Sequence, residues 1–297
     1  MKIHYGLITL LFYLLAMKVQ AQDEMDSLKM GRSIRDSLFL SEFEESKPTQ
    51  KGKVLHAEPL YIDLIRDLGA RKGEKEWNLG MGMTDKRDYD EYEALIEYEW
   101  APVDRLGFEI ELPLTLYSVR DKASIDLNQP SNRLESLKLA TQWSFLVAEK
   151  INTTLALGYI HEFELVDLKA LGRGNFFKGN IFNPFLIAAK RWGTNYHTLV
   201  YTGPRIEKEF LNAAQLTYEI HTSFHYMITG TRNFIGLEIN KEIHQGKLEA
   251  VLRPQMRVGL AENLMVGIVT GIPINRENES LSSFIRIIYE PGFRTFH

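Results

Sequence analysis

The stretch Tyr98–Leu114, written YEWAPVDRLGFEIELPL, alternates polar and apolar residues on both sides of a tight break at Ala101–Asp104. A side-chain period of two is that of a β-strand, whose successive residues point to opposite faces. One face of the two flanks carries Tyr92, Ala94, Ile96, Tyr98, Trp100, Phe108, Ile110, Leu112, Leu114 and Leu116, and the other carries Glu91, Glu93, Glu97, Glu99, Glu109, Glu111 and Thr115. The pattern predicts a β-hairpin with one polar and one apolar face.

The composition narrows the class of protein. The chain has 297 residues, enough for one large domain or two smaller ones. A formal net charge of -4 argues against a nucleic-acid partner, which usually requires a strongly basic domain. The absence of cysteine from the sequence excludes disulfides, thiolate zinc sites and cysteine nucleophiles.

The N-terminus has the layout of a secretory signal peptide over residues 1–21. Lys2 precedes an apolar stretch from Leu7 to Met17, and the small residue Ala21 is followed by a polar, acidic segment. That stretch is short for a membrane-spanning helix, which needs about 20 residues, although an uncleaved anchor is the alternative. We expect the mature chain to begin near Gln22. With no second apolar segment of that length, the exported chain is either soluble or an outer-membrane β-barrel.

From residue 74 onward, polar and apolar residues continue to alternate with a period of two to the end of the chain. The segments with strand patterning are 75–84, 91–100, 105–117, 135–148, 151–163, 182–192, 195–203, 213–229, 232–243, 247–258, 263–273 and 281–289. Membrane strands need about 9–11 residues, and single-chain bacterial barrels have an even number of strands. The sequence therefore predicts an all-β, antiparallel, up-and-down transmembrane barrel of about 12 strands over residues 74–297.

The connections and aromatic residues agree with a membrane barrel. Alternate connections are short, whereas those between them are mostly longer, which is typical of the periplasmic and extracellular ends of such barrels. An aromatic girdle is expected at the short-turn side, from Trp77, Trp100, Trp192, Tyr196, Phe234 and Tyr289. On this hypothesis the apolar face of the hairpin meets lipid. The alternative is a soluble barrel with an apolar core.

The segment LIEYEWAPVDRLGFEIELPL resembles the strand-turn-strand of bacterial outer-membrane proteins of the phenol-degradation meta-pathway family. Val103–Gly107 and Glu111–Pro113 carry the resemblance, whereas Ala101–Pro102 stand where that family usually has glycine. The likeness covers about 40 residues and is only architectural elsewhere. It implies a transporter-like barrel and does not imply phenol as the substrate.

Residues 22–73 differ from the rest and are expected to form a periplasmic extension. Pro59 suits the first turn of a helix, and Gly69 suits its end. The spacing of Leu60, Leu64, Ile65 and Leu68 predicts a short amphipathic helix between them. Such a helix is either a plug or periplasmic docking element, or a cover for the end of the barrel, which we favour.

Inward-facing polar residues determine what the barrel does. By alternation, the lumen is expected to be lined by Glu93, Glu97, Glu109, Glu111, Lys138, Glu219, His221, His225, Glu249, Arg253, Arg257 and Arg286. An acidic wall formed by the first four favours cations, as rings of carboxylates do in cation-selective pores. The alternative, which we favour slightly, is that the carboxylates pair with the arginines and hold the barrel's shape.

No catalytic or metal site and no cofactor is expected. His221 and Ser223 have the spacing of the His-x-Ser pair of outer-membrane phospholipases, but their predicted position faces the lumen. We therefore expect a passive channel or uptake protein for small solutes, in the outer membrane of a Gram-negative bacterium. Its expected partners are outer-membrane lipids, the barrel-assembly machinery and an unidentified small solute. The alternative is a non-transport barrel, either structural or a lipid-active hydrolase using His221 and Ser223.

Overall fold

The computed structural model describes most of the chain after residue 50. The described residues are 34, 36–41, 44, 51–62, 68–119, 131–168, 172, 175–228, 230–275 and 279–292. The predicted signal peptide and the start of the mature chain lie outside them. Among the described residues, no helix has the length and apolar character needed to cross a bilayer.

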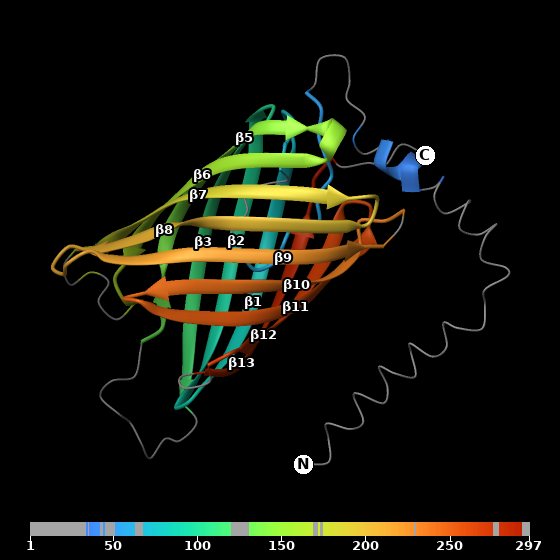
Figure 1. The fold of residues 1–297 in the computed structure, drawn as a ribbon. Helices are drawn as coiled ribbons and strands as arrows, with labels where there is room; N and C mark the ends of the chain where they lie inside the picture. Colours follow the sequence, from blue (N-terminus) through green and yellow to red (C-terminus); the bar gives the residue numbers. More distant parts are fainter. Residues whose placement is uncertain are drawn as a thin grey trace, which may run out of the picture.

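The architecture is a closed antiparallel barrel of twelve long strands (Figure 1). The elements are β1 (Lys75–Lys86), β2 (Tyr89–Val103), β3 (Leu106–Val119), β4 (Arg133–Leu134), β5 (Ser136–Ala148), the 3₁₀ turn η1 (Glu149–Ile151), β6 (Thr153–Leu165), β7 (Phe177–Trp192), β8 (Tyr196–Glu209), β9 (Gln215–Met227), β10 (Phe234–His244), β11 (Lys247–Ala261), β12 (Leu264–Pro273) and β13 (Glu279–Tyr289). Each of the twelve long strands pairs with the next long strand in the sequence, and β1 closes the ring on β13. The two-residue β4 pairs with β3, which also pairs with β5. The predicted fold class is confirmed.

The connections differ between the two ends of the barrel. One end, called the short-turn end, has the connections 104–105, 149–152, 193–195, 228–233 and 262–263. The other, the long-loop end, includes 120–132, 166–176 and 210–214, together with two tight hairpins at 87–88 and 245–246. In the second hairpin Gln245 and Gly246 both have positive φ, the conformation of a tight type I′ turn. Turn chemistry thus explains why this connection departs from the predicted sorting.

The outer face of the barrel is apolar. Ile96, Ile110 and Leu112 are 48%, 40% and 39% exposed, whereas Glu97 and Glu111 between them are buried. Large exposed hydrophobic side chains recur on the strands around the ring, including Leu139, Leu157, Leu186, Val200, Phe224, Ile235, Met256, Ile268 and Ile285. A continuous apolar band of this kind is the surface that a membrane barrel presents to lipid.

The aromatic girdle needs one correction and one addition. Trp77, Trp192, Tyr196 and Tyr289 are exposed on the outer face, and Trp100 is half-buried there, with its ring stacked 5.7 Å from Phe108. The placement of Phe234 in the girdle was wrong, because it shares its strand parity with the buried Glu238 and is only 1% exposed. Trp143, which the sequence analysis left out, is exposed on β5 beside Leu106 at the short-turn end.

Candidate functional site

The barrel is not empty, because a segment of the N-terminal extension occupies its interior. Residues 51–62 and 68–73, called the lumen segment, precede β1, and much of their length is buried among inward-facing residues of the wall. The prediction of a helix covering the barrel end was wrong for the described part. Residues 51–59 have no regular structure, and Leu60, Tyr61 and Ile62 form a bend, while residues 63–67 lie outside the described residues.

Apolar contacts with two opposite parts of the wall hold the lumen segment. Ile62 and Leu68 join a buried cluster on β5, β6, β7 and β8 that comprises Ala140, Ala156, Ile160, Phe185, Ile187, Ala189, Leu199 and Tyr201. Leu55, Ala57 and Leu60 join a second cluster with Met227, Phe234, Met265, Val269, Phe284 and Ile288. A Cβ at Gly267 would lie 2.7 Å from Leu60 Cδ2, so this glycine lets the segment approach the wall. Two apolar positions of the predicted helix, Leu60 and Leu68, therefore pack against the barrel wall, and the other two, Leu64 and Ile65, lie outside the described residues.

Polar side chains of the wall satisfy backbone groups of the lumen segment. The N–H of Ala57 donates to His197 Nδ1 at 3.0 Å, and the N–H of Leu60 donates to Gln255 Oε1 at 2.8 Å. Farther along, the N–H of Gly69 donates to Ser144 Oγ at 2.8 Å. Buried backbone donors are costly to leave unpaired. These bonds therefore explain how an irregular chain is tolerated inside a barrel.

Both ends of the lumen segment are tied to one turn at the short-turn end. The Asp104 carboxylate accepts the N–H of Lys51 at 3.1 Å and the N–H of Lys72 at 2.8 Å. The N–H of Arg105 donates to the carbonyl of Ala70 at 2.6 Å. The hydrogen bond from Lys72, followed by that from Lys51, lowers the pKa of Asp104 from its ordinary value of 3.8. The turn between β2 and β3 thus clamps the entry and exit of the segment.

Replacing Asp104 with alanine should loosen the lumen segment. We expect a loss of about 1–2 kcal/mol of unfolding free energy and faster tryptic cleavage after Lys51 and Lys72, because hydrogen bonds to an ionised acceptor are lost. Asp104→Asn, which keeps an acceptor, should lose less. Since the folded pKa is lowered, the stabilisation is present above about pH 4 and is lost as the pH falls through the folded pKa. Equal cleavage rates in the wild type and in Asp104→Ala would contradict the clamp.

A second tie comes from Glu44, which precedes the lumen segment. Its carboxylate accepts the N–H of Leu55 at 2.8 Å and pairs with Arg191 at 2.7 Å, while its carbonyl accepts from Arg71 at 2.6 Å. Burial raises the pKa of the Glu44 carboxyl, against the lowering effects of Leu55 and Arg191. Glu44 therefore links the extension to both the lumen segment and the end of β7.

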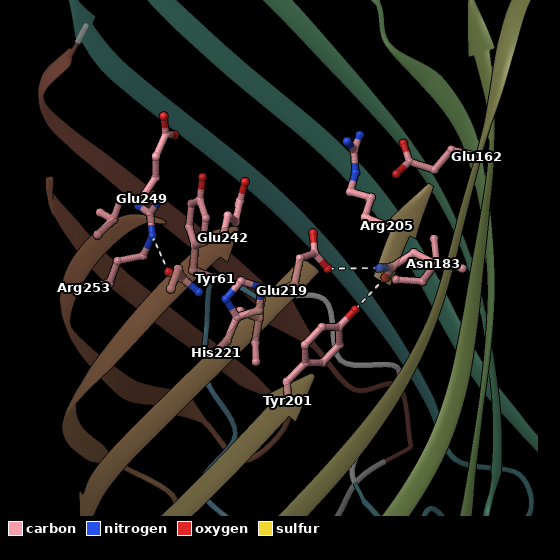
Figure 2. Close-up of a pocket in the computed structure, with 14 residues that line it drawn as sticks. Tyr61, Glu162, Asn183, Tyr201, Arg205, Glu219, His221, Glu242, Glu249 and Arg253 are labelled. Atoms are coloured by element: carbon pink, nitrogen blue, oxygen red, sulfur yellow. Dashed lines mark hydrogen bonds between the residues drawn. The ribbon is translucent and has the colours of Figure 1, made fainter. Parts of the chain in front are cut away.

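Above the lumen segment, a cavity of about 360 Å³ lies toward the long-loop end. Its floor includes Tyr61 and Ile62, and its walls include Glu162, Asn183, Tyr201, Arg205, Glu219, His221, Asn240, Glu242, Glu249 and Arg253. Figure 2 shows Asn183 between Tyr201 and Glu219, with hydrogen bonds of 2.6 Å from the tyrosine hydroxyl and 3.0 Å to the carboxylate. The cavity is polar and contains more carboxylates than arginines.

Tyr61 separates this cavity from a second one. Its ring packs edge-on against the ring of Phe284, with 5.7 Å between the two centroids. The Cζ atom of Arg253 lies 3.3 Å from the centroid of the Tyr61 ring. The second cavity, of about 280 Å³, lies beside Tyr61 and is bordered by Glu93, Glu111 and Lys138. On the short-turn side of Tyr61, the cavity around Glu58, Pro59 and Leu60 holds only about 30 Å³, roughly one water. The lumen segment therefore narrows the interior most strongly toward the short-turn end.

The predicted acidic wall lies on β2 and β3. Glu97, Glu109 and Glu111 are buried and face inward, whereas Glu93 is half-buried at the second cavity. Glu97 lies 3.5 Å from Arg286, and Glu111 lies 2.8 Å from Lys138. These two carboxylates therefore have the geometry expected if the acidic wall is paired with cationic side chains. Their role in conduction stays a prediction.

The other predicted lumen residues lie on β9, β11 and β13. His221, His225, Arg253, Arg257 and Arg286 are buried. Glu219 is half-buried and Glu249 is exposed, both bordering the larger cavity. Arg253 donates to Asn240 at 2.7 Å, and Arg257 lies over the ring of Phe234 at 4.7 Å. On the acidic wall, Glu97 and Glu111 pair with Arg286 and Lys138, neither of which lies on β11.

The hydrolase alternative finds no support in the geometry. His221 stacks on Tyr201, with 5.3 Å between centroids, and its Nδ1 accepts the N–H of Lys241 at 3.3 Å. The buried Ser223 Oγ has no hydrogen-bond partner among the described residues. A serine nucleophile needs a base within hydrogen-bond reach, and these contacts do not provide one.

Sequence reasoning missed several residues that hold the lumen segment. His56 bonds Thr154 at 2.9 Å and His197 accepts from Ala57, yet neither histidine stood out in the alternation. Asn78, on β1, donates to carboxylates of the acidic wall. The alternation along β1 and β8 could have identified Asn78 and His197, because it places both side chains on the inner face.

A model of the family described as HAEPLYID-like matches residues 52–290. Its name spells His56–Asp63, which begins within the lumen segment. No curated protein is significantly similar in sequence to this chain.

Solved structures share the fold. The COG4313 outer membrane channel from Pseudomonas putida F1 is 13% identical, with a TM-score of 0.58, and the match covers 77% of this chain and 99% of that one. The KdgM porin in complex with disordered oligogalacturonate is 11% identical, with a TM-score of 0.50, and the match covers 75% of this chain and 99% of that one. The resemblance seen in the sequence is thereby confirmed at the level of the barrel fold.

Proposed function

This chain belongs to the HAEPLYID-like family, and we propose that it is a plugged channel of the outer membrane that admits small solutes by passive diffusion. The lumen segment is the plug, and conduction requires it to move. The proposal rests on the difference between two cavities inside the barrel. The cavity on the long-loop side of Tyr61 has a volume of about 360 Å³, whereas the cavity beside Glu58 on the short-turn side has a volume of about 30 Å³. A solute can enter the barrel but meets the plug.

The proposed location and orientation follow from the barrel's surfaces. An apolar outer band with aromatic residues near the short-turn end suits an outer membrane. In such barrels the short turns are periplasmic, which would place the larger cavity on the extracellular side. The clamp at Asp104 and the tie at Glu44 would then lie within reach of periplasmic proteins.

The lining supports small polar solutes, with a preference for cations. A volume of about 360 Å³ lies in the usual range for small-molecule sites. Four glutamates, Glu162, Glu219, Glu242 and Glu249, face two arginines, Arg205 and Arg253, around this cavity. Clefts with an excess of one charge raise the local concentration of the opposite ion.

Locking the plug should close the channel. The protein lacks cysteine, so Ala57→Cys with His197→Cys introduces one thiol pair at a contact between plug and wall. In planar bilayers we expect conductance steps from the wild type and from the reduced double variant, and at least a tenfold lower open probability after oxidation. Each single-cysteine variant, treated with the same oxidant, is the control.

Two results would contradict the proposal. Unchanged conductance in the oxidised double variant would show that the plug does not gate. Absence of conductance from the wild type and from all reduced variants, including those with the plug loosened by Asp104→Ala, would show that the barrel is not a channel.

A further inference from the structure

Two histidines of the barrel wall lie where the plug is seated. His197 on β8 and His225 on β9 are direct cross-strand partners on the inner face. Their exposed fractions are 1% and 0%. The ring of His56, which belongs to the plug, stands edge-on to the ring of His197, with 6.4 Å between the two centroids. The plug therefore brings a third imidazole to this pair.

The hydrogen bond from the plug fixes the protonation state of His197. Its Nδ1 atom accepts the N–H of Ala57 at 3.0 Å, so this nitrogen must carry a lone pair and no proton. The imidazole is then neutral, with its hydrogen on Nε2. A second proton would have to bind Nδ1, where it would face the N–H of Ala57 and turn an attractive contact into a repulsive one.

His225 lies in a largely apolar pocket beside the plug. Neither of its ring nitrogens has a hydrogen-bond partner among the described residues, and nor does Nε2 of His197. The His225 ring packs edge-on against Phe234, with 4.6 Å between the centroids, and Phe234 belongs to the buried cluster that holds Leu55 and Ala57. A charged imidazole needs acceptors or water for its two N–H groups. While the plug is seated, this pocket therefore suits a neutral ring.

The charged groups around the pair oppose protonation. Arg191, the cross-strand partner of His197 on β7, and Arg257 on β11 both place positive charge near His197. Arg257 also acts on His225. Glu44 offsets only the first of these charges, because its carboxylate pairs with Arg191 at 2.7 Å. An added proton on either ring would thus meet positive charge inside a buried pocket.

We propose that protonation of His197 and His225 releases the plug, so that the lumen segment is seated at neutral pH and withdraws in acid. Without the plug, both rings would face water in the lumen and could take up protons with the ordinary pKa of histidine, about 6.5. The seated state therefore binds fewer protons than the released state, and its stability falls as the pH drops below about 6.5. Each histidine contributes up to about a tenfold change in the seating equilibrium per pH unit.

Hydrogen exchange of the refolded full chain in detergent measures release of the plug without any need for conduction. The switch rests on the plug mobility that the proposed function requires, yet the two can fail separately. After correction for the intrinsic effect of pH on amide exchange, the protection of residues 55–60 should fall about tenfold or more between pH 7.5 and pH 5.5. The protection of β7 should stay constant.

Replacing both histidines tests whether they carry the response. The double variant His197→Asn/His225→Leu removes both titrating rings, while the asparagine oxygen can still accept the N–H of Ala57. Its protection over residues 55–60 should change by less than about threefold between the two pH values. His161→Asn, on the outer face of β6, is the matched control and should keep the wild-type response. Protection of β7 at pH 7.5 shows that each variant is folded.

Several results would overturn the switch. Unchanged protection of residues 55–60 in the wild type would do so, as would an intact response in the double variant. Loss of the response in Glu44→Gln, with the histidine variant still responding, would assign acid release to the Glu44 carboxyl, whose pKa is raised by burial. Loss of protection over β7 as well would mean that acid unfolds the barrel. Absence of conductance from a protein that shows the acid response would contradict the channel and leave the switch intact.

Discussion

Replacing Lys138 with methionine should cost about 3–5 kcal/mol of the free energy of unfolding, the usual consequence of breaking a buried ion pair. Lys138 Nζ lies 2.8 Å from Glu111 Oε1, and both side chains are almost completely buried. Methionine keeps most of the aliphatic length but removes the ammonium group. Glu111 would then remain in a wall that already contains Glu97 directly opposite. Urea unfolding in detergent measures the loss.

The double variant Lys138→Met/Glu111→Gln is the control. Removing the carboxylate charge together with the ammonium should recover much of the loss, because replacing both members of a buried pair is often nearly neutral. The difference between the double variant and the two single variants gives the coupling energy. Additive losses would mean that Lys138 stabilises the barrel by packing and not by pairing with Glu111.

Replacing Leu112 with arginine should cost about 2–4 kcal/mol, because it places a charge in the middle of the apolar band. Leu112 lies near the centre of β3 and is 39% exposed on the outer face. The same substitution at Val103, which is exposed at the end of β2, should cost about 0–1 kcal/mol near the membrane interface.

Reversible unfolding with the barrel refolded into lipid vesicles distinguishes the two positions. The comparison is controlled, since both variants exchange an exposed aliphatic residue for the same cation. Equal losses in detergent and in lipid, or equal losses at the two positions, would contradict a lipid-facing band centred near Leu112.

The barrel could be predicted from the sequence because polar and apolar residues alternate along its strands and so indicate which side chains face the lumen and which face lipid. In β2 and β3, Ile96 and Ile110 mark one face, while Glu97 and Glu111 mark the other. The same alternation restricts the pairing register of neighbouring strands, because a slip of one residue would move every glutamate to the lipid-facing side. The strands, their order and the sorting of most connections were therefore open to prediction.

The plug could not be predicted in the same way. Residues 51–62 have no secondary-structure period, because their backbone donors bond to side chains distant in sequence. On β7 and β8 both faces are partly apolar: Ile187 and Leu199 point inward, yet nothing in their own strands specifies a plug as their partner. Leu60 and Leu68 suggested a helical stripe, although they contact different walls. The acidic wall followed from alternation, whereas its hydrogen bond from Asn78 and its ion pairs with Lys138 and Arg286 depend on how distant strands meet in the closed barrel.

The attachment of both ends of the lumen segment to Asp104 has a consequence for how the chain is assembled. A loop that goes in and comes out through one mouth can enter a ring that has already closed, and no chain end has to be threaded through it. Its contacts join residues far apart in sequence, with Leu60 separated from Gln255 by 195 positions, so they form only after most of the ring exists. The part of the mature chain that is synthesised first is thus among the last to reach its place. The same topology lets it withdraw without opening the seam between β1 and β13.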